Sequence, residues 1–314
     1  MRVIWSIKDA EFCTPSVLTM GIFDGVHTGH QQILNITRER AQKEGAYSVL
    51  LTFEPHPGFV LKSDVPDIRL LSTIDEKIEI LEDIGLDCLV IANFTQSFAT
   101  TAAEKYVKDL IVDGMRARQI IIGHDHAFGR GRRGNVDLLA RLGKKYGFTV
   151  DAVSPVIDSE EQTVSSTRVR ELIAARDVET AAILLGRPYS VHGQVINGTG
   201  RGNKIGFPTA NIRLFSQYKL VPGDGIYATR SRINGVTYAS VTYVGTRPTF
   251  GLEERVIESH LIDFDKDIYG SEITLYFYKC LRQEQQFKDE QSLAEAIKQD
   301  KGKAEKLLQN GGTD

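Results

Sequence analysis

Residues 17–30 read VLTMGIFDGVHTGH, an apolar run followed by a glycine-rich turn and two histidines. The run predicts a buried strand over Val17–Ile22, and the periodicity after it predicts a helix that opens near His30 and ends at Gly45. In an open α/β sheet, such a turn faces the crevice where ligands bind. Its glycines let the backbone approach a ligand closely, and the helix N-terminus offers unpaired N–H groups to a phosphate.

The rest of the first half repeats this alternation of short apolar runs and helical periodicity, which predicts a parallel sheet covered by helices. Thr73-x-x-Glu76 and Thr101-x-x-Glu104 both have the pattern of a capping box, and Gly85 ends the helix that follows Thr73. The further strands are expected at Tyr47–Phe53, Cys88–Ala92, Gln119–Ile122 and Phe148–Val153.

The second half has a different pattern. A helical stretch over Val169–Leu185 is followed by Gly186-Arg187-Pro188, where we place a domain boundary. Beyond it the chain alternates with period two, as at residues 273–278, and Asn234-Gly235 separates two such runs. An antiparallel barrel or sandwich is expected, with a final helix over Ser292–Leu308 packed against it.

The composition excludes several classes of protein. A length of 314 residues favours two domains, and a net charge of −3 with interspersed signs creates no field that gathers nucleic acid or an anionic membrane. Cys13, Cys88 and Cys280 have neither disulfide-framework nor zinc-knuckle spacing, and no apolar run could span a bilayer. We therefore expect a cytoplasmic protein without nucleic-acid or membrane partners, and we leave self-association open.

The first candidate site is the histidine pair. His27 and His30 lie three residues apart at a helix start, where two imidazoles could donate hydrogen bonds to a triphosphate and stabilise a departing pyrophosphate. The alternative is that they only cap the helix or bind a metal. Residues 165–170, SSTRVR, open a later helix and favour the first interpretation, because they place hydroxyl, N–H and guanidinium groups where phosphates bind.

Two further loops accompany this site. Residues 123–134, GHDHAFGRGRRG, are suited to a lid over an anionic nucleotide or to RNA binding, and the first is expected in a chain without a wider basic surface. His124 and His126 are an alternative, weaker metal site, because no third ligand is near in sequence. Residues 54–57, EPHP, predict a turn at the same sheet edge.

The second candidate site is residues 198–211, GTGRGNKIGFPTAN, a glycine-rich cationic loop whose amides could cradle phosphates. Thr209 and Asn211 lie two apart on an extended segment, so their oxygens share one side and suit Mg²⁺ that bridges ATP phosphates. Glu258 and His260 share one face of a later strand. The pattern alone leaves Glu258 either a surface residue or a general base.

Together these motifs resemble the bifunctional bacterial riboflavin kinase/FMN adenylyltransferase family, also called FAD synthetases. The first half carries GxFDGxHxGH at 21–30, TFEPHP at 52–57, GxDxxFGxGRRG at 123–134 and SSTxxR at 165–170. The second half carries LGRPY at 185–189, RGxxxGFPTAN at 201–211, GIYA at 225–228, VGTRPTFG at 244–251 and ExHLxDF at 258–264. The resemblance implies a Rossmann-like nucleotidyltransferase domain at 1–184 and an antiparallel flavokinase barrel with a terminal helix at 185–314.

By the same resemblance, the substrates and products are ATP, riboflavin, FMN and FAD, with Mg²⁺ as cofactor. His27 and His30 would hold ATP phosphates during adenylyl transfer, and Glu258 would take the proton of the riboflavin 5′-hydroxyl. Flavin would lie near Pro55, Asp125, Phe128 and Arg282, and Mg²⁺ near Thr209 and Asn211. Nucleotide contacts are expected at Gly21, Phe23, Gly29, Ser166, Thr167, Arg170, Gly198, Arg201, Lys204, Pro208 and Thr209.

The chain departs from the family pattern at Ile22, His126 and Asn203, where Asn, Phe and Arg are frequent. These three departures bear on the affinity for flavin and on the strength of a phosphate contact, and none is at a predicted catalytic residue. Two other functions compete with this one: a single activity with the other domain kept for flavin sensing or RNA regulation through Arg130–Arg133, and an HxGH enzyme with another phosphate acceptor. The motifs of both activities are intact, which argues against the single-activity alternative. The HxGH enzyme with another acceptor leaves the barrel half without an explanation.

Overall fold

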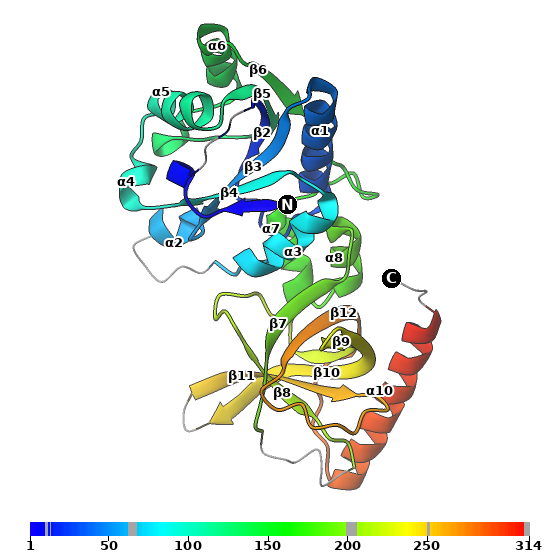
Figure 1. The fold of residues 1–314 in the computed structure, drawn as a ribbon. Helices are drawn as coiled ribbons and strands as arrows, with labels where there is room; N and C mark the ends of the chain where they lie inside the picture. Colours follow the sequence, from blue (N-terminus) through cyan, green and yellow to red (C-terminus); the bar gives the residue numbers. More distant parts are fainter. Residues whose placement is uncertain (10–11, 13, 62–67, 199–205, 250–251, 311–314) are drawn as a thin grey trace. The chain divides into compact units, whose positions relative to one another are not determined.

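The computed structural model describes residues 1–9, 12, 14–61, 68–198, 206–249 and 252–310 (Figure 1). By its contacts the chain forms two compact units, Met1–Ser166 and Thr167–Asp314. Helix α7 (Ser166–Ala174) begins at this division. The domain boundary predicted from the sequence lies later in the chain, at 184/185, and it stays a prediction.

The first unit is built on a parallel sheet of six strands in the order β1-β4-β3-β2-β5-β6. Its strands are β1 (Arg2–Ile4), β2 (Ser16–Met20), β3 (Tyr47–Glu54), β4 (Cys88–Asn93), β5 (Ala117–Gly123) and β6 (Thr149–Val153). Strand β2 lies between β3 and β5, so the strand order reverses at its carboxyl end. In an open sheet this is where a ligand crevice forms, and the predicted position of the glycine-rich turn is thus confirmed.

Apolar side chains alternate between the two faces of this sheet. Leu18, Val49 and Val90 pack with η2 (Val107–Gly114, a π-helix) and α6 (Val136–Tyr146), whereas Leu50 and Leu89 pack with α1 and α3. Both faces are therefore buried, which explains the continuous apolar runs. The helices of this unit are α1 (Thr28–Glu44), α2 (Pro57–Leu61), α3 (Ile74–Ile84), α4 (Gln96–Ala99), α5 (Ala103–Tyr106), η2 and α6, with short 3₁₀ turns at Ile7–Asp9 and Arg130–Arg132.

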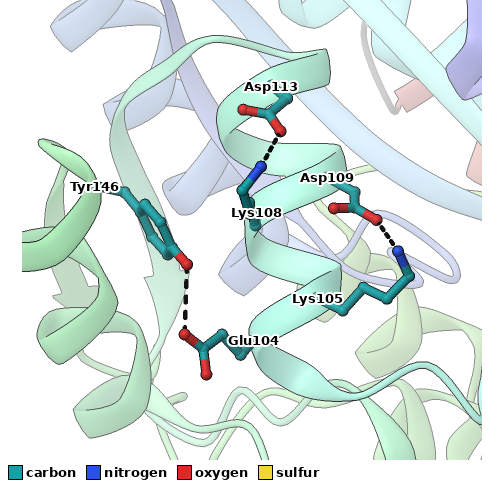
Figure 2. Close-up of polar contacts among 6 residues, drawn as sticks. All are labelled: Glu104, Lys105, Lys108, Asp109, Asp113 and Tyr146. Atoms are coloured by element: carbon teal, nitrogen blue, oxygen red, sulfur yellow. Dashed lines mark hydrogen bonds and ion pairs between the residues drawn. The ribbon is translucent and has the colours of Figure 1, made fainter.

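The first predicted capping box is confirmed and the second is wrong. Thr73 accepts from the Glu76 N–H while the Glu76 carboxylate accepts from the Thr73 N–H. Helix α5 instead begins after Ala102, which makes no side-chain cap. Figure 2 shows that the Tyr146 hydroxyl donates to the Glu104 carboxylate. The Lys145 ammonium also donates to it at 2.6 Å, so Glu104 pairs with residues of α6.

Two predicted segment ends also differ. Strand β2 ends at Met20, two residues before Ile22: the Gly21 N–H still donates to the Leu51 carbonyl, and the chain then turns into the left-handed Phe23. The stretch 169–185 is two helices, α7 and α8 (Val178–Leu185), with a break at Arg176, whose φ is 72°. The Asp177 carboxylate accepts from the Thr180 N–H and caps α8, and such a cap competes with continuation of the preceding helix.

The second unit is a closed antiparallel barrel in the order β10-β11-β8-β7-β12-β9, which decides between barrel and sandwich. Asn234 and Gly235 form the β9–β10 turn with φ of 51° and 78°, as predicted. Its elements are β7 (Tyr189–Ile196), β8 (Ala210–Leu214), β9 (Gly225–Ile233), β10 (Val236–Thr249), β11 (Leu252–Leu261), β12 (Glu272–Arg282) and α10 (Glu290–Asn310). Helix α10 packs on β9 and β10 through Ala304 and Leu308, which confirms the expected terminal helix. Among the described residues, no helix is long and apolar enough to cross a bilayer.

Candidate functional site

The turn between β2 and α1 has an unusual backbone. Phe23 and Val26 have φ of 51° and 43°, in the left-handed region that side chains with a Cβ rarely occupy. A Cβ on Gly29 would lie 3.3 Å from the imidazole of His27, so glycine leaves this ring its place. Strained turns of this kind persist where the surrounding structure fixes them, and they cluster at functional sites.

The two histidines meet at the start of α1. His27 is the N-cap, and its Nδ1 accepts from the His30 N–H at 3.3 Å. The ring proton of a neutral His27 therefore lies on Nε2. The imidazoles stack with centroids 3.6 Å apart, and the Phe23 ring lies 4.6 Å from that of His30. Capping and phosphate binding are thus compatible roles for His27, because they use different ring nitrogens.

Burial, followed by the neighbouring His27 and Lys77, holds the pKa of His30 well below its ordinary value of 6.5. The His30 ring is therefore neutral at pH 7 and can donate one hydrogen bond. Among the described residues its Nδ1 is buried and has no hydrogen-bond partner. A triphosphate beside the ring would favour the charged form and oppose this shift.

The start of α7 lies beside the same turn. The Ser166 hydroxyl donates to the Asp24 carbonyl at 2.9 Å, and the Val164 carbonyl lies 3.8 Å from the Cβ position of Gly29. The structure thus brings Ser166 to the histidine turn, as its motif predicted. Thr167 and Arg170 follow on α7, and their contacts with nucleotide stay a prediction.

Two of the residues that the resemblance placed near flavin follow neighbouring strands. Pro55 comes directly after β3, and exposed Asp125 comes just after β5, so both lie at the edge where β2 ends. Phe128 is buried against Tyr106, with ring centroids 5.5 Å apart, and its backbone pairs with Gly134. It therefore acts as a core side chain in this structure. No group of three or more His, Cys, Asp or Glu in the described part of the chain could hold a metal, which leaves the His124/His126 metal site without support.

The second site lies on the barrel, where β8 pairs with β11. Asn211 stands opposite Glu258 in the register, so their side chains share a face. The Thr209 hydroxyl donates to the Glu258 carboxylate at 3.4 Å. Ser259 points the other way, into the barrel, where its hydroxyl meets that of Thr242 at 3.0 Å. Glu258 is therefore on the outer face, beside both predicted metal ligands.

The strand that leads into this site is held by its neighbours. The Pro208 carbonyl lies 2.8 Å from His260 Nδ1, and a Cβ on Gly198 would overlap the Asn211 amide nitrogen. Only glycine at position 198 lets the Asn211 amide lie there. Arg201 and Lys204, which were expected to contact phosphates, lie outside the described residues, as does Asn203, which departs from the family pattern.

Comparison with known proteins identifies the family. The FAD synthetase family matches residues 9–168, and the riboflavin kinase family matches residues 185–308. The chain belongs to the bifunctional riboflavin kinase/FMN adenylyltransferase family. A relative with that name from Bacillus subtilis is 34% identical over 94% of this chain and 93% of its own, and one from Pseudomonas fluorescens is 36% identical over 93% and 92%. A crystal structure described as a macrolide-efflux protein from Streptococcus pneumoniae has a TM-score of 0.88 and 31% identity over 99% of both chains.

Arg282, which was expected to lie near flavin, forms an ion pair within the second unit. Its guanidinium donates to the Asp300 carboxylate at 2.9 and 2.8 Å, and Asp300 is only 2% exposed. The guanidinium carbon also lies over the Phe287 ring, 5.5 Å from its centroid. Arg282 therefore joins β12 to α10, and its role toward flavin stays a prediction.

Two charged residues that were not predicted from the sequence, Asp24 and Lys77, hold the histidine turn in place. The Asp24 carboxylate accepts from the N–H groups of Leu71 and Ser72 at 3.0 Å each, and so fixes the segment before α3. Lys77 contacts the same turn from α3. One signal was visible: Lys77 falls on the apolar stripe of Ile74, Leu81 and Ile84, where a charged residue needs a partner.

Proposed function

We propose that this protein makes both flavin cofactors, phosphorylating riboflavin to FMN on the barrel and adenylylating FMN to FAD on the first unit. The observation that supports this most directly is the match of both families in order along one chain, each with its own constellation of polar groups. A cytoplasmic location is part of the proposal, in keeping with the unpaired thiols of Cys88 and Cys280.

In adenylyl transfer, a phosphate oxygen of FMN attacks the α-phosphorus of ATP. The bond to the β-phosphate oxygen breaks, and pyrophosphate leaves with the electron pair. The groups assigned to this step are His27 and His30, whose ring N–H groups would stabilise the charge on the departing pyrophosphate. The N-terminus of α1 lies beside them, and its N–H groups would bind further phosphate oxygens. The Ser166 hydroxyl donates to the Asp24 carbonyl and so fixes the turn.

In riboflavin phosphorylation, the 5′-hydroxyl attacks the γ-phosphorus of ATP, ADP leaves, and the hydroxyl proton passes to Glu258. The oxygens of Thr209, Asn211 and Glu258 gather at one strand pair, and hard oxygen ligands of this kind fit Mg²⁺. When bound, Mg²⁺ would neutralise phosphate charge. Thr209 and Asn211 would hold it, while Glu258 orients and deprotonates the hydroxyl.

The direct test is to incubate the full chain with riboflavin, ATP and Mg²⁺ and to separate the products by chromatography. FMN should appear first, and FAD should then accumulate together with pyrophosphate. FMN without FAD, or FAD made only from supplied FMN, would reduce the protein to a single activity. Failure to consume riboflavin or FMN would contradict the proposal as a whole.

Thr209→Ala should raise the apparent KM for ATP in riboflavin phosphorylation, and excess Mg²⁺ should partly reverse the effect. The variant removes one oxygen ligand and leaves the proton acceptor in place. KM measured across a Mg²⁺ titration checks this, with FAD formation from supplied FMN as the control. An increase that is the same at every Mg²⁺ concentration would contradict a metal-holding role.

A fragment that starts at Leu185 should phosphorylate riboflavin but melt at a lower temperature than one that starts at Thr167. The longer fragment keeps α8, which contacts β12 and β7 and has Val178, Ala181 and Leu184 buried. Each large apolar side chain lost from such a contact costs about 1.5–3 kcal/mol. Circular dichroism melting and FMN formation measure both properties. Equal melting temperatures would show that α8 does not support the barrel, and a folded but inactive short fragment would refute the boundary at 184/185.

A further inference from the structure

Helix α3 carries a lysine where its pattern calls for an apolar residue. Lys77 is 4% exposed and lies on the same stripe as Ile74 and Leu81. A buried ammonium is costly unless it is paired and hydrogen-bonded, so its partners indicate what it does.

The Lys77 ammonium donates to the carbonyl of Ile22 at 2.7 Å and contacts the Thr52 hydroxyl at 3.4 Å. Thr52 in turn donates to the same Ile22 carbonyl at 3.0 Å. One carbonyl therefore receives two side-chain donors, one from α3 and one from β3. Ile22 directly precedes Phe23, the first left-handed residue of the turn that carries His27 and His30.

The charge of Lys77 interacts with other ionisable groups near the histidine turn. Burial lowers the pKa of the Lys77 ammonium, and the carboxylates of Asp24 and Glu54 oppose this by favouring its charged form. Burial of Glu54 raises the pKa of that carboxyl, an effect that Lys77 opposes and Asp75 adds to. Lys77 contributes to the lowered pKa of His30, together with burial and His27. The ammonium is thus coupled to the stacked imidazoles as well as to the backbone of their turn.

We infer that Lys77 is a positioning residue for adenylyl transfer, which holds the histidine turn through the Ile22 carbonyl. The inference rests on the proposed adenylyltransferase function of that turn. Lys77 acts through the main chain, and the groups that touch ATP remain His27 and His30. A displacement of about 1 Å in a catalytic group can cost a hundredfold in rate, so a buried hydrogen bond at the root of the turn matters to the chemistry.

Lys77→Met keeps the aliphatic stem and removes both the donor and the charge. We expect kcat for FAD formation from FMN to fall about tenfold to a hundredfold, with a much smaller change in the KM for FMN. Lys77→Arg keeps a donor and a charge and should recover a large part of that loss. Riboflavin phosphorylation by the same preparations should not change.

A second measurement does not depend on turnover. Removal of the Lys77 charge should raise the pKa of His30, as followed by NMR titration of the imidazole carbons with His30→Gln to assign the signal. Lys108→Met is the matched control, because the Lys108 ammonium is exposed and pairs with Asp113 at 2.8 Å (Figure 2). That control should change neither kcat nor the His30 titration.

The outcomes separate this inference from the function on which it rests. Wild-type protein that makes no FAD from FMN would overturn the function. Active wild-type protein together with a folded Lys77→Met of unchanged kcat and unchanged His30 pKa would overturn the role of Lys77. If Lys77→Met does not fold, Lys77→Gln decides, because its neutral side chain is shorter than lysine and removes the charge while keeping a polar end. A folded Lys77→Gln with unchanged kcat and unchanged His30 pKa would then overturn the role of Lys77.

Discussion

Glu258→Gln is expected to slow riboflavin phosphorylation by about 10²–10⁴, the usual contribution of a group that accepts a proton in the transition state. Glutamine preserves the size of the side chain and can still accept the hydrogen bond from Thr209, but it cannot take the proton of the 5′-hydroxyl. Fold and riboflavin binding should therefore survive. The conversion of supplied FMN to FAD should also continue, because it is assigned to the other compact unit.

The matched control for this variant is Glu272→Gln. Glu272 lies on barrel strand β12, and its side chain is 71% exposed beside His192. Steady-state rates of FMN formation with saturating ATP and Mg²⁺ compare the two variants. A Glu258→Gln rate close to that of the control would make Glu258 a surface or binding residue, and the proton acceptor would have to be another group on the barrel.

His30→Ala is expected to lower FAD formation from FMN by roughly a hundredfold or more, the scale for removal of one preorganised donor to developing charge. The ring packs against those of Phe23 and His27, so its donor needs little reorganisation when pyrophosphate departs. Single-turnover measurements with FMN and ATP separate this loss of chemistry from weaker binding. FMN formation from riboflavin is the internal control and should barely change.

Because His30 also packs in the turn, the variant needs a test of folding. Circular dichroism and thermal melting should show a folded first unit, and His192→Ala on the barrel is the matched substitution that leaves the turn untouched. A folded His30→Ala with normal FAD synthesis would restrict the histidine pair to the capping role that His27 plays through Nδ1.

Much of the fold was predictable because its signals are local. Apolar runs placed strands β2 to β6, Gly45 and Gly85 ended α1 and α3, and Asn234-Gly235 formed the β9–β10 turn. The failures were local competitions that spacing does not reveal. Glu104 preferred Lys145 to a capping box, and Asp177 started a new helix within a periodic stretch.

The sequence by itself determined the two candidate motifs, since His27 and His30 meet at one helix start, and Thr209 lies two residues before Asn211 at the start of a strand. Only the tertiary structure shows which distant groups touch them. The contact of Lys77 with Ile22 spans 55 residues, and that of Thr209 with Glu258 spans 49. Such contacts depend on strand order and register, which arise from how whole elements pack together. Helical and strand periods report which face of an element is buried, but they do not report which other element covers it.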